Sequence, residues 1–402
     1  MKKQIALTVI LTASLLFTAF AQEQKKKVKM TDLPYIELTD FNLYWGCAPW
    51  RDDKVVTLDG LGRWATIEFY KTKDGTDKAR FVPLCDFPRY TVSSDIESHP
   101  DSGWLLVWSS KMLHAYNADT GRSNSFVPIA SWKGFVGNIF PMSTDDLLCQ
   151  FYWSDLEDIK CIFYFTYNNR TKIIDRSHSE LTEVFVWKQL RKYGKTFLAS
   201  ECLDLEKDIQ KFFFYDWDKK EKTENELTKE MSKHLYKTYH KNIHINMEKR
   251  ILVSTSVLLD NGTILMMWNK EYADIKIIPF KLIEPKNTYS DIQSVSGDCE
   301  WILVHICGYK GIYGEFLNRY AFVRISNEYP GMLSPLVFVE GFWKYREWKH
   351  CSFFKHPEYG DCFIATYTEL PSLKKHTRLY KMSDVQEKID RILLEKAKSV
   401  VK

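Results

Sequence analysis

Two segments of the chain concentrate side chains suited to binding a ligand. Residues 44–53 read YWGCAPWRDD, and residues 340–349 read EGFWKYREWK. Aromatic and arginine side chains dominate binding hot spots, and aromatic faces also suit sugars and cations. We therefore expect a ligand-binding site made of Tyr44, Trp45, Trp50, Arg51, Trp343, Tyr345, Arg346 and Trp348. The alternative is that these side chains seal a contact between two parts of the fold.

The chain carries no motif that predicts catalysis. It lacks G-x-G-x-x-G, a P-loop, H-E-x-x-H and G-x-S-x-G. Ser352 and Lys355 match S-x-x-K by letter only, without the companion motifs of that chemistry. Acidic pairs such as Asp52 and Asp53 are expected in turns, and glycosidase chemistry would need two carboxylates to converge across a pocket. We predict no catalytic residue and no cofactor, with a hydrolase or lyase as the alternative.

Histidine spacing gives little support for a metal site. His240 and His244 lie four residues apart and share a face in a strand or in a helix. Lys241 and Lys249 flank them and would oppose a cation. We expect surface histidines and no metal.

Cysteine spacing leaves two interpretations open. The chain has nine cysteines and no Cys-x-x-Cys, which argues against a zinc ribbon or a redox site. Cys149 with Cys161, and Cys351 with Cys362, flank predicted hairpin turns. Opposed residues on antiparallel strands lie close enough for a disulfide, but cysteine also serves as a small buried apolar residue.

The N-terminus has the pattern of an export signal over residues 1–21. Lys2 and Lys3 precede a short apolar stretch, and Ala19-Phe20-Ala21 fits the cleavage rule. We expect a periplasmic or secreted protein that begins with a leader segment at 22–39. Removing the two lysines lowers the formal charge from +4 to +2, which gives no case for nucleic acid as a partner. No later stretch of 18 apolar residues occurs, so the mature chain is expected to lack a transmembrane segment.

A repeated hairpin must position these residues. An alternating strand, a turn with glycine and aspartate, and a second strand that closes on Val-Pro occur at 68–84 and again at 113–129. Related segments follow at 163–175, 212–224, 266–280, 319–339 and 366–382. Several of these units have a further apolar hairpin upstream, for example at 94–110, 251–268 and 351–367. The pattern predicts four short strands in each unit.

Four strands per unit, repeated seven times, resemble the blades of secreted β-propeller proteins in general, and WD-repeat propellers only loosely. The resemblance implies an all-β, seven-bladed β-propeller of four-stranded antiparallel blades over residues 40–382, with six blades as the alternative. Thr57, Asp59 and Trp64 nearly match a sialidase Asp-box, but Leu61 and Arg63 depart from it. The two aromatic segments would then meet where the first and last blades adjoin.

Two helices are expected outside the repeat. One lies within 223–239, with Thr223 and Glu226 as a capping box. The other is a C-terminal amphipathic helix at 383–402, with Ser383 and Gln386 as its capping box. Its apolar stripe consists of Val385, Ile389, Ile392, Leu393 and Ala397. We expect this stripe to pack on the propeller, with a partner helix as the alternative.

The sequence therefore favours an exported, non-catalytic binding or scaffold module. Its partner would be a protein, a peptide or a glycan, recognised through aromatic and basic loops. Two alternatives remain: a propeller hydrolase or lyase acting on envelope or extracellular polymers, and a structural subunit of a cell-envelope assembly.

Overall fold

The computed structural model of the protein divides into two units, residues 1–34 and residues 35–402. The described residues are 33–400 with gaps at 53, 86–94, 109–112, 127–133, 143–145, 156–157, 169–173, 176–190, 194–195, 205–208, 217, 220, 235–239, 247–250, 257–262, 269–274, 281–287, 310–315, 327, 330–332, 340–344 and 370–371. The predicted signal and residues 22–32 of the leader lie outside the described residues.

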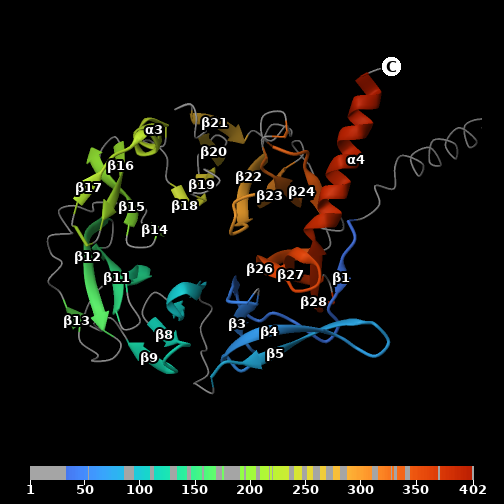
Figure 1. The fold of residues 1–402 in the computed structure, drawn as a ribbon, viewed down its shortest axis with the longest axis horizontal. Helices are drawn as coiled ribbons and strands as arrows, with labels where there is room; N and C mark the ends of the chain where they lie inside the picture. Colours follow the sequence, from blue (N-terminus) through green and yellow to red (C-terminus); the bar gives the residue numbers. More distant parts are fainter. Residues whose placement is uncertain are drawn as a thin grey trace, which may run out of the picture. The chain divides into compact units, whose positions relative to one another are not determined.

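The described residues form seven four-stranded antiparallel sheets (Figure 1). Six of them consist of four strands in chain order, each paired with the next. These are β2 to β5 (Cys47–Pro49, Val55–Leu58, Trp64–Lys71, Asp77–Pro83), β6 to β9 (Asp95–His99, Trp104–Trp108, Leu113–Asn117, Arg122–Phe126), β10 to β13 (Gly134–Pro141, Asp146–Asp155, Asp158–Asn168, Ile174–Asp175), β14 to β17 (Arg191–Tyr193, Thr196–Asp204, Ile209–Asp216, Glu221–Thr223), β18 to β21 (His240–Asn246, Ile251–Ser256, Thr263–Trp268, Ile275–Phe280) and β22 to β25 (Thr288–Val295, Trp301–Tyr309, Phe316–Arg324, Val337–Val339). The predicted units are therefore confirmed as four-stranded sheets.

The seventh sheet joins the two ends of the second unit. It contains β26 (Tyr345–His356), β27 (Gly360–Glu369), β28 (Lys375–Lys381) and, beyond β28, the early strand β1 (Ile36–Glu37). Ile36 pairs with Leu379, and Glu37 pairs with Arg378. The sheet that ends the chain is thus completed by a strand from its beginning.

Local turn chemistry explains why the hairpin repeats. In the β8–β9 turn, Oδ1 of Asn117 accepts hydrogen bonds from the backbone N–H groups of Asp119 and Thr120, both at 3.1 Å. Gly121 completes the turn at φ +62°, a conformation that side chains disfavour. The β4–β5 turn places Gly75 at φ +82° in the same way. These short polar sequences reverse the chain and set the register of the flanking strands.

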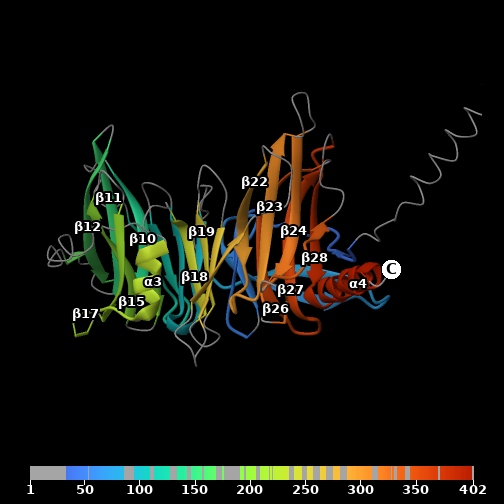
Figure 2. The same ribbon diagram turned by 90° about the horizontal axis from the view of Figure 1, so that it is seen from above.

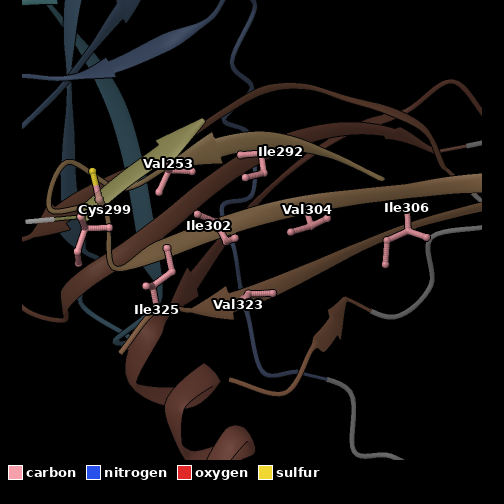
Figure 3. Packing of buried hydrophobic residues seen from close by; sticks show 9 residues of the cluster. Val253, Ile292, Cys299, Ile302, Val304, Ile306, Val323 and Ile325 are labelled. Carbon is pink, nitrogen blue, oxygen red and sulfur yellow. The ribbon is translucent and has the colours of Figure 1, made fainter. Parts of the chain in front are cut away.

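Each sheet must bury two apolar faces, and consecutive sheets do this for one another. Figure 3 shows Val253 of β19 packed with Ile292, Ile302 and Val304 of the next sheet; all four are buried. Phe322 of β24 lies edge-on to Phe363 of β27, with ring centroids 5.2 Å apart. Across both contacts, sheets that are neighbours in sequence lie next to each other in space.

The first and last sheets also meet. Strand β2 lies beside β26, and Phe69 of β4 stacks on Phe354 of β26 with ring centroids 5.3 Å apart. The strand β2 also lies beside β6 of the following sheet. The described parts of the two aromatic segments, residues 44–52 around β2 and residues 345–349 in β26, therefore belong to adjoining sheets, as the sequence predicted.

Both predicted helices are present, but their capping boxes were predicted wrongly. Helix α3 spans Glu226–His234, and its cap is Asn225: Thr228 N–H donates to Asn225 Oδ1 at 3.0 Å, and Asn225 N–H donates to Thr228 Oγ1 at 2.9 Å. Thr223 lies in β17 instead. Two residues separate the predicted cap from the observed one because β17 holds the chain extended up to Thr223.

The C-terminal helix α4 spans Met382–Val400 and lies alongside β27 and β28 (Figure 2). Val385 and Ile389 are fully buried, whereas Ala397 is exposed. The predicted packing is therefore confirmed for the first turns and wrong for the last ones. Leu394 is 55% exposed, and the remaining described residues to Ser399 are exposed as well.

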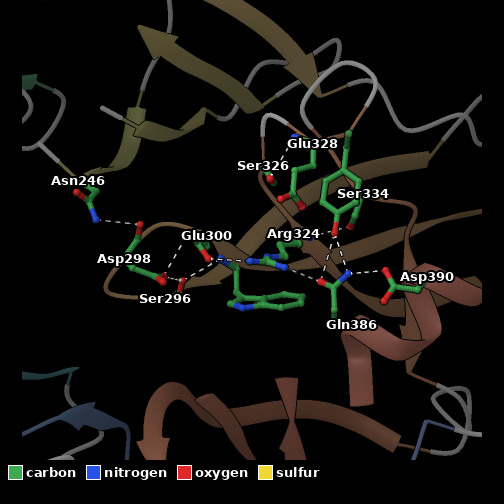
Figure 4. Close-up of polar contacts among 12 residues, drawn as sticks. Asn246, Ser296, Asp298, Glu300, Arg324, Ser326, Glu328, Ser334, Gln386 and Asp390 are labelled. Atoms are coloured by element: carbon green, nitrogen blue, oxygen red, sulfur yellow. Dashed lines mark hydrogen bonds and ion pairs between the residues drawn. The ribbon is translucent and has the colours of Figure 1, made fainter. Parts of the chain in front are cut away.

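Gln386 anchors α4 rather than capping it (Figure 4). Its Oε1 accepts a hydrogen bond from Arg324 Nη1 at 2.9 Å, and its Nε2 donates to Asp390 Oδ1 at 2.8 Å. Arg324 also pairs with Glu300 at 3.3 Å. A half-buried polar network therefore joins α4 to the sheet β22 to β25.

Neither pair of cysteines considered for a disulfide is directly opposed across its hairpin. In β26 and β27, Cys351 opposes Ala365 and Cys362 opposes Phe354, and both cysteines are free. Cys149 opposes Phe165, and Cys161 opposes Trp153. Each pair misses alignment because the turn is centred closer to its second cysteine. Burial raises the pKa of the Cys362 thiol to about 12, so this thiol stays protonated at neutral pH.

Candidate functional site

A pocket of about 280 Å³ lies where three sheets meet. Its walls come from the turn after β2, from the turn between β22 and β23, and from the ends of β26 and β27 that face each other across their turn. All three turns join an edge strand of a sheet to the strand beside it. The pocket thus combines groups from residues about 50, 300 and 355, which are far apart in the sequence.

The turn after β2 contributes Trp50 and Lys54. Trp50 N–H donates to the carbonyl oxygen of Lys54 at 2.7 Å, which closes the turn, and Asp52 takes φ +52° within it. Aspartate tolerates this left-handed conformation better than most residues. Trp50 is half-buried and Lys54 is exposed, so both remain accessible from the pocket.

Arg51 holds this turn against the next sheet. Its guanidinium forms a bidentate ion pair with the Asp119 carboxylate, in which Nη2 lies 2.9 Å from Oδ2. Its Nε also donates a hydrogen bond to the carbonyl oxygen of Pro100. The hydrogen bonds from Arg51 lower the pKa of the Asp119 carboxyl below its ordinary value. The guanidinium carbon also lies 5.3 Å from the Trp50 ring centroid. Arg51 therefore packs on Trp50 and ties it to the next sheet.

The turn between β22 and β23 contributes Asp298 and Trp301. Asp298 Oδ1 accepts hydrogen bonds from the Ser296 hydroxyl and, at 3.0 Å, from the Glu300 N–H (Figure 4). Ser296 Oγ in turn accepts from the Trp301 N–H at 2.9 Å. The Asp298 carboxylate therefore accepts hydrogen bonds within its own turn. Trp301, at the end of that turn, is buried.

The ends of β26 and β27 contribute Phe353, Lys355 and Asp361. Lys355 and Asp361 oppose each other in the strand register, and both are exposed. Among the described residues, the charged side-chain groups of Lys54, Lys355 and Asp361 have no hydrogen-bond or ion-pair partner. The pocket thus presents two ammonium groups and one carboxylate that form no ion pair with the described residues.

The structure places the four predicted binding residues of the first segment in different environments, and Trp50 alone among these four lines the pocket. Trp50 lines the pocket, and Arg51 supports it. Trp45 is half-buried against an apolar cluster that includes Trp64 of the first sheet and Leu105 of the second, so it packs between these two sheets and not at the closure between the first and last sheets that the sequence left open. Tyr44 is 46% exposed outside the pocket lining, with Lys375 Nζ 5.2 Å from its ring centroid.

The second segment is only partly described. Trp343 lies outside the described residues. The backbones of Tyr345, Arg346 and Trp348 belong to the first part of β26, where Trp348 pairs with Tyr367, but their side chains lie outside the described part. Their predicted role in binding stays a prediction.

Sequence reasoning missed Lys54, Asp298, Trp301, Lys355 and Asp361. Their shared signal is position: each lies at or beside a turn that joins an edge strand of a sheet to the strand beside it. That signal becomes informative only after the strands have been assigned and the sheets have been placed next to one another.

The partial Asp-box at 57–64 and the S-x-x-K match at 352–355 both have structural roles. Asp59 is buried, and its Oδ1 accepts from the N–H groups of Leu61 and Arg63 in the β3–β4 turn, both at 2.9 Å. Its neighbour Trp64 is fully buried. The Ser352 hydroxyl donates to the carbonyl oxygen of Phe353 at 3.0 Å, so the S-x-x-K letters carry no nucleophile.

No protein-family profile and no curated protein matches the chain. Among solved structures, oligogalacturonate lyase in complex with manganese is similar at 13% identity, over 84% of this chain and 88% of that chain, with a TM-score of 0.44. A hypothetical selenium-binding protein from Sulfolobus tokodaii is similar at 11% identity, over 86% and 89%, with a TM-score of 0.41. The WD40 domain of SCAP from fission yeast is similar at 10% identity, over 86% of each chain, with a TM-score of 0.35. These similarities assign no function to this chain.

The chain's own topology indicates a β-propeller type of fold. Consecutive four-stranded antiparallel sheets that bury each other's faces are the units of such folds. A ligand site where the turns of several sheets converge is compatible with this architecture. Within the part of the chain that the structure describes, no helix is both long and apolar enough to cross a membrane.

Proposed function

We propose that the protein is an exported, non-catalytic binding module that holds its ligand in the pocket around Trp50. The observation that supports this is an accessible aromatic ring beside Lys54, Lys355 and Asp361, charged groups that have no partner among the described residues. Concave sites with aromatic walls and a few convergent polar groups are the usual form of ligand sites.

We further propose that the seven sheets close into a seven-bladed ring. The pairing of β1 with β28, and the contact of β2 with β26, support closure at the point where the chain begins and ends. The proposal of export rests on the signal pattern of residues 1–21.

The pocket suits binding better than hydrolysis. Glycoside hydrolysis uses two carboxylates, one as an acid and one as a base or nucleophile. Asp298 is engaged by its own turn, which leaves Asp361 as the one unengaged carboxylate among the described lining residues. Cys362 also lines the pocket, but burial keeps its thiol protonated, so it is a poor nucleophile.

A retention assay tests the proposal. The purified protein is passed over an immobilised polysaccharide fraction from cell envelopes, together with the Trp50→Ala and Tyr44→Ala variants. We expect the wild type and Tyr44→Ala to be retained and Trp50→Ala to pass through, because Trp50 lines the pocket and Tyr44 does not. New polymer ends are measured over time, and none should accumulate.

Two results would overturn this function. Accumulation of new ends would favour the hydrolase or lyase alternative. Equal retention of wild type and Trp50→Ala would show that the pocket is not the binding site. If truncation after Leu393, which removes the exposed end of α4, abolished retention while Trp50→Ala did not, the structural-subunit alternative would be favoured.

A further inference from the structure

We propose that the ligand group in this pocket is an uncharged sugar ring of a glycan. The inference rests on the proposed binding function and names the chemical class that the pocket selects. It follows from the size of the pocket, its balance of charges and the placement of Trp50.

The size of the pocket limits the ligand to a small unit. Its volume of about 280 Å³ lies just below the usual range for ligand sites, which begins at roughly 300 Å³. One or two sugar rings match that space. A longer ligand would have to continue out of the pocket over the surrounding turns.

The charges of the pocket balance, which disfavours a ligand with net charge. Lys54 and Lys355 carry two positive charges, and Asp298 and Asp361 carry two negative ones. An anion attracted by the lysines would also meet the two carboxylates, and a cation would meet the lysines. Electrostatic complementarity of this kind favours a neutral polar group over either.

Lys355 and Asp361 form the polar part of the proposed sugar site. They oppose each other on neighbouring antiparallel strands, so their Cβ atoms lie about 5 Å apart. An ammonium group only donates hydrogen bonds, and a carboxylate only accepts them. Adjacent hydroxyl groups of a sugar can both donate and accept, so they can bind this donor–acceptor pair in one orientation.

Trp50 forms the apolar part of the site. It is half-buried, lines the pocket and is held by Arg51, which is itself fixed by Asp119. The C–H face of a sugar ring packs against such an aromatic face. Because the indole is held in place before the ligand arrives, little conformational entropy is lost on binding.

Calorimetric titration with defined probes tests the inference. The probes are neutral trisaccharides of glucose, mannose and galactose, the corresponding uronate trisaccharides, and the dipeptide Ala-Ala. We expect at least one neutral trisaccharide to bind more tightly than every uronate and than the dipeptide. Trp50→Ala and Asp361→Asn should each weaken that binding about tenfold or more. Lys73→Met, at an exposed lysine in the β4–β5 turn, should leave it unchanged.

The Asp361→Asn variant distinguishes a neutral sugar from an anionic ligand, because it should weaken binding of the first and strengthen binding of the second. If the ligand were an anion, removing a carboxylate from the pocket would strengthen binding of the uronates. Preferential binding of a uronate or of the dipeptide, an unchanged affinity in Asp361→Asn, or no binding of any trisaccharide would each overturn the sugar inference. If retention on the envelope polymer still depended on Trp50, the proposed binding function would stand without it.

Discussion

Replacing Glu37 by alanine should loosen the strand that completes the last sheet. Glu37 Oε1 lies 2.7 Å from His376 Nδ1, and Oε2 accepts a hydrogen bond from Arg378 Nε at 3.3 Å. The Arg378 guanidinium carbon lies 3.7 Å from the ring centroid of Tyr35, the residue before β1, and 4.6 Å from that of Tyr367. These contacts, with the two-residue pairing of β1, hold the start of the second unit to its end.

The expected loss follows from the burial of the contact. A hydrogen bond to a charged group contributes about 1.5–3 kcal/mol when buried. The Glu37 side chain is 31% exposed and that of Arg378 is 12% exposed, so solvent screens part of this energy. We therefore expect Glu37→Ala to cost about 2 kcal/mol in total. In a chain of this size, that lowers the melting temperature by about 3 °C.

Thermal unfolding followed by circular dichroism measures this effect. Glu395→Ala is the matched control, because Glu395 is exposed on the last turns of α4 and should change stability by less than about 0.5 kcal/mol. Limited proteolysis near residue 35 should also become faster in Glu37→Ala than in the control. Equal melting temperatures and equal cleavage rates for Glu37→Ala and the wild type would refute the idea that this contact holds the two ends together.

Three further changes should alter stability in defined ways. Ile389→Ala should cost about 3 kcal/mol in urea unfolding because Ile389 is fully buried, whereas Leu394→Ala, at an exposed position of α4, should cost less than about 0.5 kcal/mol. Asn225→Ala removes the cap of α3 and should cost about 1 kcal/mol, seen as faster amide exchange in that helix. Burial lowers the pKa of His356 below 6.5, and its Nδ1 accepts two backbone hydrogen bonds, so the unfolded chain binds the proton more readily. Stability should fall as pH drops below about 6.5, and a melting series in His356→Gln should show a shallower fall.

The repeated sheets could be predicted because their signals are local. The turn at Asn117–Gly121 contains both the side-chain acceptor and the glycine that reverse the chain, and both can be identified in the sequence. The buried face of α4 at Val385 and Ile389 likewise follows from helical spacing. Such features depend on residues that are close together in the chain.

The sequence was least informative where a shift of two or three residues decides the outcome. Cys351 and Cys362 flank the same turn, but the turn is centred at Glu358, so the two cysteines are not opposed. The cap of α3 was displaced from Thr223 to Asn225 for a similar reason. Turn centres and helix starts are the least certain elements of any reading of a sequence pattern.

The candidate site could be predicted only in part. Trp50 stood out by its residue type, but Lys355 and Asp361 are ordinary strand-end residues in the sequence. They become notable because three sheets place them beside Trp50. Convergence of this kind depends on packing between sheets, which residue types and spacing do not encode locally.

Amide hydrogen exchange, measured with and without soluble fragments of the envelope polysaccharide, shows directly whether the pocket around Trp50 binds the ligand. If the pocket is the binding site, amides in residues 50–54, 296–301 and 355–361 should become protected together, although they belong to three separate sheets. Protection limited to other segments, such as the exposed turns of α4, or to just one of these three turns, would contradict the account.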